Sequence, residues 1–202
     1  MSELIAIATN TGYILKDGEA VYLDAHDAAV GNDVDNDYSV YLGQYPALFH
    51  VARGAVMFSL ATIPPGADIL SATLSLYGEN DTSTTDFDVV LVSGADLADT
   101  LVLADFGDLL DEITSFGSFN TSAFVLEDWN VITLNATGIA VLQAAIGGTV
   151  RFGVRSSLDI SATPPAGQDF VYFYGTDATA SKKPKLTITY KGFPHSQAHI
   201  IG

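Results

Sequence analysis

The sequence predicts an all-β protein, a jelly-roll β-sandwich of about ten strands with one or two short helices. Short runs with an apolar residue at every second position are separated by turn residues along the chain. The sequence has no regular alternation of strand and helix patterns, which argues against a parallel α/β sheet. Of the 24 acidic residues, 19 are aspartate, which favours turns and caps over helix interiors.

The strand pattern is clearest in the middle and at the end of the chain. In 53–60, the alternation turns Val56 and Phe58 toward one face. In a later strand, the same alternation places Arg151 and Arg155 on the solvent side. Further strands are predicted at 72–77, 87–92, 131–134, 150–155, 170–174 and 186–190, with weaker ones at 4–8, 20–23 and 39–42.

Two segments have a helical pattern. Residues 105–113 are enough for two turns, and residues 137–146 are enough for a short helix. We expect Asn135 or Thr137 to cap the second helix and the glycines at 147–148 to end it. Both helices are expected to pack over an end or a face of the sandwich.

The composition argues against several classes of partner and chemistry. Eight Lys and Arg residues against 24 Asp and Glu residues give a net charge of −16. Nucleic acid and anionic membranes are therefore not expected partners, because both require clustered positive charge. The absence of cysteine excludes disulfides, thiolate zinc sites and cysteine nucleophiles. No apolar run approaches the ~18 residues of a transmembrane helix, and the first residues do not resemble a cleaved signal.

The segment 53–77 resembles the hallmark of the DNRLRE-type, carbohydrate-binding-module-like jelly rolls. A strand leads into an Ile-Pro-Pro-Gly-Ala turn and then a Ser-Ala-Thr-Leu-Ser-Leu-Tyr strand. Two further segments, 128–134 and 173–190, look like that family's lead into a short helix and its closing strand. The resemblance covers roughly 31–190, although Ser59 stands where family members often carry Asp and the Arg-rich segment is missing. It implies a jelly-roll fold in an extracellular setting, as in cell-surface proteins, secreted polysaccharide-active enzymes and phage virions.

We expect three segments along the chain. Residues 1–30 are predicted as an N-terminal arm with weak strands, residues 31–191 as the jelly-roll sandwich, and residues 192–202 as a C-terminal tail. The tail is expected to join a neighbouring subunit through its apolar residues. These candidate assembly residues are Phe193, Ile200 and Ile201.

The acidic cluster Asp33, Asp35 and Asp37 is the candidate metal site. Carboxylate oxygens at alternate positions suit a structural Ca²⁺, and Asp24 and Asp27 could join them. The cluster lacks the glycine and the distal glutamate of an EF-hand loop. The alternative interpretation is a solvated acidic turn without a cation.

Aromatic residues form the candidate sugar-binding surface. Tyr38, Tyr41 and Tyr45 lie in one turn-rich stretch, and Trp129 is the single tryptophan. Exposed aromatic rings stack on the apolar faces of sugar rings. The alternative is that Trp129 closes one end of the sandwich while the tyrosines bridge the sheet and its loops.

The sequence does not predict an enzyme. No Ser-His-Asp arrangement stands in a nucleophile motif, and no pair among the 24 acidic residues is distinguished as a glycosidase pair. We therefore expect no catalytic residues and no cofactor apart from the candidate calcium ion.

The favoured function is a structural display module on the surface of a phage-like virion, as a head-decoration, head-fibre or tail-associated protein. Its expected partners are other virion proteins, further copies of itself, with a trimer as the expected oligomer, and host glycans. The alternative is a carbohydrate-binding module of a cell-surface or secreted glycan-active protein.

Overall fold

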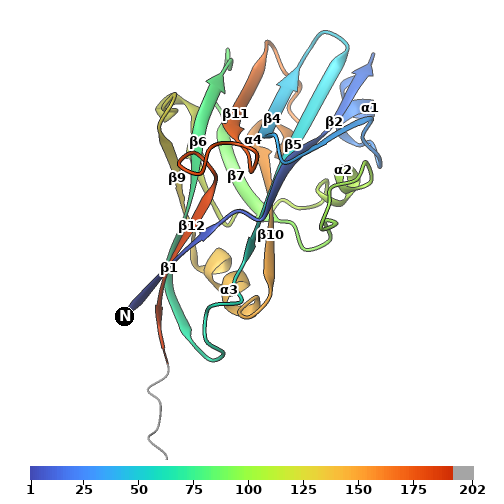
Figure 1. Ribbon diagram of the computed structural model, residues 1–202. Coiled ribbons are helices and arrows are strands. Elements are labelled where there is room, and N and C mark those ends of the chain that lie inside the picture. Colours follow the sequence, from blue (N-terminus) through green and yellow to red (C-terminus); the bar gives the residue numbers. More distant parts are fainter. Residues whose placement is uncertain (193–202) are drawn as a thin grey trace, which may run out of the picture.

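The computed structural model describes residues 1–192 and confirms the all-β prediction (Figure 1). Within this range the chain forms twelve strands, four short α-helices and one 3₁₀ turn. The strands are β1 (Ser2–Ile7), β2 (Asn10–Glu19), β3 (Asp33–Asn36), β4 (Ser39–Tyr45), β5 (Phe49–Ser59), β6 (Asp68–Asp81), β7 (Asp88–Ser93), β8 (Gly117–Asn120), β9 (Trp129–Thr133), β10 (Thr149–Ser156), β11 (Asp169–Tyr174) and β12 (Lys185–Lys191). The helices are α1 (Tyr22–His26), α2 (Asp105–Asp108), α3 (Ala136–Ala144) and α4 (Ser157–Ile160), and the 3₁₀ turn is η1 (Thr121–Ala123).

The strands pair antiparallel in one curled sheet, in the order β1-β12-β6-β11-β4-β5-β10-β7-β8. Strand β9 lies beside β6, while β2 lies beside β5 and carries β3 on its other edge. The curl brings the two halves of this order face to face, and the pairing of β4 with β5 joins them at one end (Figure 1). Residues 1–30 contribute strands to this sheet, because β1 pairs with β12 and β2 pairs with β5.

The main hydrophobic core fills the space between the two halves of the sheet. Val56 and Phe58 of β5 belong to the same buried cluster as Leu74 of β6 and Leu186 of β12. All four side chains are fully buried, and burial of a side chain of this size contributes about 1.5–3 kcal/mol. Every second side chain of a strand points to the same face, so apolar residues at alternate positions all reach this core. The period-2 pattern therefore predicts these strands correctly.

A second hydrophobic core lies on the opposite face of β5. The side chains of Val51, Ala55 and Met57 are buried there with Phe106, under α1, α2 and the segment between β7 and β8. Residues 51–58 are therefore buried without interruption, although β5 belongs to an antiparallel sheet.

This covering layer explains three corrections to the sequence prediction. Residues 20–23, predicted as a strand, instead form a bend followed by the first two residues of the short helix α1. The helical segment predicted at 105–113 contains only the single turn α2. Arg155, predicted to face solvent, is fully buried because the layer covers its side of β10, whereas Arg151 stays partly exposed.

Helix α3 follows the prediction closely. The side chain of Asn135 accepts a hydrogen bond from the backbone N–H of Gly138 at 3.0 Å, which caps the first turn. Gly147 follows the helix with a φ of +84°, a left-handed conformation that glycine adopts without strain.

Candidate functional site

The candidate site is a cleft of about 300 Å³ where β4, β5 and β11 meet. We call it the aromatic cleft. Most of its lining consists of aromatic rings, and it opens to solvent near the junction of the two halves of the sheet. The lining residues are Tyr41, Tyr45, His50, Gln168, Phe170 and Tyr172.

Strand alternation places the rings in the cleft. Val40 of β4 and Val171 of β11 point into the main core, so the neighbouring Tyr41 and Tyr172 point to the opposite face. Tyr41 and Tyr172 are directly paired across the two strands. Beside them, a Cβ on Gly43 would lie 2.0 Å from the backbone oxygen of Asp169, so only glycine allows this close approach of β4 and β11.

The aromatic rings of the cleft differ in exposure, and the partly exposed rings pack against buried ones. Tyr41 stacks on Tyr172 with ring centroids 4.4 Å apart and an interplanar angle of 10°. Tyr13 meets Tyr41 edge-on at 5.1 Å, and Phe170 lies 4.8 Å from Tyr41. Tyr41 is only 6% exposed, whereas Tyr172 is half-buried and Tyr45 is 37% exposed. The buried rings hold the exposed rings in position for a ligand.

The aromatic cleft is uncharged at neutral pH. Burial raises the pKa of Tyr41, so its phenol stays protonated, and burial lowers the pKa of His50. Beside the cleft, a carboxylate oxygen of Asp17 lies 3.8 Å from Nδ1 of His50. Among the described residues, no lysine, arginine or carboxylate lines the cleft.

A second hollow of about 410 Å³ adjoins the aromatic cleft. It is lined by Tyr38, Ser39, Glu79 and Asn80, and it shares Tyr172 with the cleft. The Ser39 hydroxyl donates to a carboxylate oxygen of Glu79 at 2.9 Å, which fixes the orientation of that carboxylate. The two hollows therefore form one surface divided by the ring of Tyr172.

The structure brings together three of the four residues predicted to contact a glycan. Tyr41 and Tyr45 line the aromatic cleft, and Tyr38 lines the adjoining hollow. Trp129 lies instead beside Tyr77, with ring centroids 5.1 Å apart, and the ammonium of Lys185 sits 3.7 Å above its ring. Trp129 therefore lines neither hollow.

Sequence reasoning missed the half of the cleft that comes from β5 and β11. His50 closely follows the tyrosine-rich stretch in sequence and pairs with Tyr45 where β4 turns into β5. Phe170 and Tyr172 are far from that stretch in sequence and reach it only through the pairing of β11 with β4. The one signal for them was the aromatic strand predicted at 170–174, but its pairing partner could not be read from the sequence.

The three candidate calcium ligands lie on and just after β3. Asp33 and Asp35 are paired with Leu15 and Tyr13 of β2, and Asp37 follows with a φ of +75°. Within residues 1–192, no three Asp, Glu or His side chains converge in a way that could hold a metal ion. Calcium binding here stays a prediction, which thermal melting with and without EDTA tests.

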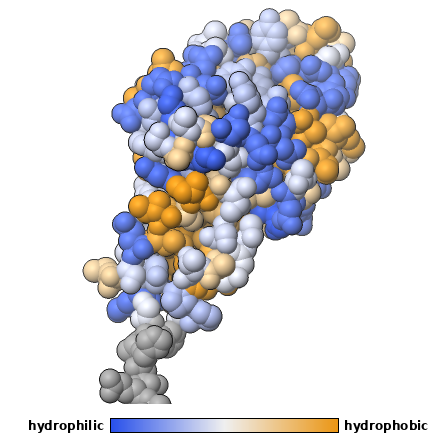
Figure 2. Space-filling view, viewed as in Figure 1, coloured by the Kyte–Doolittle hydropathy of each residue, from blue (hydrophilic) through white to orange (hydrophobic). Residues whose placement is uncertain are grey.

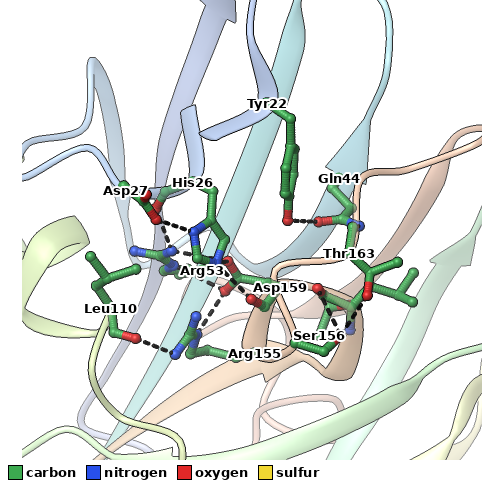
Figure 3. Close-up of polar contacts among 12 residues, drawn as sticks. Tyr22, His26, Asp27, Gln44, Arg53, Leu110, Arg155, Ser156, Asp159 and Thr163 are labelled. Atoms are coloured by element: carbon green, nitrogen blue, oxygen red, sulfur yellow. Dashed lines mark hydrogen bonds and ion pairs between the residues drawn. The ribbon is translucent and has the colours of Figure 1, made fainter. Parts of the chain in front are cut away.

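A separate polar cluster is buried between the sheet and its covering layer (Figure 3). Asp159 accepts two hydrogen bonds from Arg53, at 2.9 and 3.0 Å, and one from Arg155 at 2.7 Å. His26 approaches the backbone oxygen of Asp159 at 2.7 Å, and its other ring nitrogen lies 2.5 Å from Asp27. Arg53, Arg155 and Asp159 are each fully buried, and we call this group the buried ion cluster.

The buried ion cluster fastens the covering layer to the sheet. Arg53 donates to the backbone oxygens of Phe106 and His26, and Arg155 donates to that of Leu110. Burial alone would raise the pKa of Asp159, but the two arginines outweigh it and hold that pKa below the usual range. The charges are paired and inaccessible to solvent, so the cluster has a structural role.

The chain was compared with family models and with curated proteins. No family model and no curated protein matches this chain. The resemblance to DNRLRE-type jelly rolls therefore stays a prediction. In the part of the chain that the structure describes, no helix is long and apolar enough to cross a membrane. The predicted assembly residues Phe193, Ile200 and Ile201 lie outside the described residues.

Proposed function

We propose that this chain is a non-catalytic display module that binds a neutral oligosaccharide in the aromatic cleft. The observation that carries this proposal is the solvent-accessible wall formed by Tyr45 and Tyr172 over the buried ring of Tyr41. Rigid aromatic walls with a few polar groups are typical of small-ligand sites. The apolar faces of sugar rings pack on such walls, while phenol, imidazole and amide groups bind the sugar hydroxyls.

The charge of the surface favours a neutral ligand over an acidic one. Among residues 1–192, no cationic side chain lines the cleft to pair with a carboxylated or sulfated sugar. Asp17 beside His50 and Glu79 in the adjoining hollow would both repel such a ligand. An amino sugar is compatible with these carboxylates.

The size of the surface favours a chain of sugars over a monosaccharide. Tyr172 lines both hollows, so one sugar ring on each side of it would use the whole surface.

The arrangement also favours binding over hydrolysis. Glycosidases place two carboxyl groups on either side of the scissile bond, whereas Glu79 is the one carboxylate among the residues that line these two hollows.

Affinity electrophoresis through gels that contain a soluble polysaccharide tests the proposal. We expect at least one neutral polysaccharide, from a panel of glucans, mannans, galactans and soluble chitin fragments, to retard the protein. Alginate, which is acidic, should not. Tyr172→Ala should abolish the retardation, because it removes the ring shared by the two hollows.

Trp129→Ala is the matched control. It also removes a partly exposed aromatic ring, but that ring lines neither hollow and lies under Lys185. The control should be retarded like the unmodified protein, with circular dichroism confirming that both variants are folded. Migration unaffected by every neutral polysaccharide, or equal retardation of Tyr172→Ala, would contradict the proposal.

We propose the virion surface as the setting of this module. The support comes from the sequence: the acidic, cysteine-free composition, the resemblance to domains found in phage virions, and the apolar tail after β12. Detection of the chain in purified particles by mass spectrometry would support this setting. Detection only in a secreted or cell-surface fraction would favour the carbohydrate-binding module of a glycan-active protein.

A further inference from the structure

Strand β1 presents an unprotected edge of the sheet. It pairs with β12 on one side, and no described strand pairs with its other side. Its sequence, Ser-Glu-Leu-Ile-Ala-Ile, contains no proline and no lysine, and Ile5 and Ile7 are 54% and 45% exposed. Hydrophobic atoms gather over β1 in the space-filling view (Figure 2). An exposed, apolar edge of this kind is a template for pairing with another strand.

The free hydrogen-bonding groups of β1 can be assigned from its pairing with β12. The backbone N–H of Ala8 donates to the oxygen of Pro184 at 2.9 Å, in the register that pairs Ile7 with Lys185. Successive residues of a strand direct their N–H and C=O groups to opposite edges. The backbone N–H and C=O groups of the even-numbered residues therefore point toward β12. Those of Glu3, Ile5 and Ile7 point toward the open edge.

In the described chain, three other strands also pair with a single neighbour, namely β3, β8 and β9. Each of them has a feature that hinders pairing with another chain, and β1 lacks these features. Strand β3 has four residues and carries two carboxylates, Asp33 and Asp35. Hydrogen bonds hold the start of β8 next to the end of β9, because Asn135, which follows β9, donates to the backbone oxygens of Ser115 and Phe116, which precede β8. Short edges, charges and coverage are the usual means of preventing edge pairing.

We propose that β1 pairs antiparallel with β1 of a second copy of this chain, across a two-fold axis at Ile5. This register places Ile5 opposite its own symmetry mate and Glu3 opposite Ile7, so all three residues with free backbone groups form hydrogen bonds. Shifting the two strands in either direction leaves some of these groups unpaired. The edge is thus self-complementary, as an isologous two-fold interface requires.

The charges near β1 suit this pairing although each copy carries a net charge of −16. Glu3 is the one charged side chain in β1. Because Ile7 is paired with Lys185, the proposed register places Glu3 in the same cross-strand row as Lys185 of the second copy. The two Glu3 side chains lie at opposite ends of the paired strands. The dimer joins two short edges and is expected to be weak, because a small contact area is typical of transient association.

Site-specific cross-linking tests the pairing, since the chain has no cysteine of its own. Ile5→Cys would place two thiols next to each other at the two-fold axis, because opposite residues in such a pair have Cα atoms about 5.5 Å apart. Leu23→Cys is the matched control, because Leu23 is similarly exposed, at 51%, but lies on α1 away from this edge. With a short bismaleimide, the full chain with Ile5→Cys should give several-fold more covalent dimer than Leu23→Cys.

Sedimentation velocity of the unmodified chain provides a second measurement. The weight-average sedimentation coefficient should increase with concentration, and Ile5→Lys should remove that increase while the far-ultraviolet circular dichroism stays unchanged. The pairing predicts a two-fold dimer, in contrast to the trimer expected from the sequence. Equal cross-linking of the two cysteine variants, a sedimentation coefficient independent of concentration, or a trimer unaffected by Ile5→Lys would overturn it.

Discussion

The two sides of β5 differ in how far their polar side chains are exposed to solvent. On one side, Arg53 is fully buried and each of its contacts is to the covering layer or to Asp159. Near the end of the same strand, His50 is partly exposed and lines the aromatic cleft. One strand thus supports both a closed polar cluster and an open aromatic surface.

This difference distinguishes a structural group from a binding surface. A buried charge is tolerated only when paired and hydrogen-bonded, so the contacts of the buried ion cluster are fully used within the fold. Tyr45 and Tyr172 line the open cleft, and both are partly exposed to solvent. We therefore expect substitutions in the ion cluster to change stability, and substitutions in the cleft to change binding.

Asp159→Asn should give the largest loss of stability. It leaves two buried arginines without their counter-charge, and removing one partner of a buried ion pair costs about 3–5 kcal/mol. Urea denaturation followed by circular dichroism measures this. Asp99→Asn is the control, because Asp99 is 85% exposed in its pair with Arg151, and the loss of such a surface pair costs about 0–1 kcal/mol. Similar losses for both variants would contradict the structural role of the cluster.

Acidification should remove the same stabilisation from the unmodified protein. The folded-state pKa of Asp159 lies below its unfolded value, so its contribution is fully present above about pH 4 and is lost as the pH falls through the depressed pKa. Denaturation curves between pH 7 and pH 2 should show the stability advantage over Asp159→Asn shrinking only in the acidic part of that range. An advantage that shrinks already near neutral pH would disagree with the pairing.

Gly43→Ala should affect both stability and the cleft. A side chain there would collide with the backbone of Asp169 and Phe170 at a φ of +132°, and strain of this kind costs about 1–3 kcal/mol. Because β4 and β11 would be forced apart beneath Tyr41, polysaccharide binding should weaken as well. Gly18→Ala, with a φ of +84° and no heavy atom within 4 Å of the added Cβ, should cost only about 1 kcal/mol and leave binding intact.

His50 should produce a small pH dependence near neutrality. Its pKa is lowered from 6.5 mainly by burial, so the unfolded chain binds a proton more readily than the folded chain. Stability should therefore be greatest above about pH 6.5 and decrease as the pH falls below it. The slope of unfolding free energy against pH should be shallower in His50→Gln. An identical slope in the variant would show that this histidine does not titrate as the cleft geometry requires.

The sequence predicts the sandwich well because its core is periodic. Leu74, Leu186 and Ile188 alternate with polar residues, and this alternation can be read from the sequence without knowing which strands pair. The covering layer has no such period, since Phe106 and Leu109 are buried from a largely irregular segment. This is why Arg155 looks exposed in the sequence.

The candidate site is predicted only in part because its members are brought together by strand pairing. Tyr41 and Tyr45 belong to one recognisable aromatic stretch, but Tyr172 lies far along the chain and meets them through the pairing of β4 with β11. Likewise, the partner of Arg53 in the ion cluster is 106 residues away. Such contacts depend on register, which period-2 patterning alone does not specify.

The most direct test compares Asp159→Asn with Tyr172→Ala in calorimetric titrations with the neutral polysaccharide that most strongly retards the unmodified protein. Both variants are measured at a temperature at which both are folded. We predict that Asp159→Asn binds like the unmodified protein despite its lower stability, and that Tyr172→Ala shows no measurable heat of binding. Loss of binding in Asp159→Asn with full binding in Tyr172→Ala would contradict the assignment of the aromatic cleft as the binding surface.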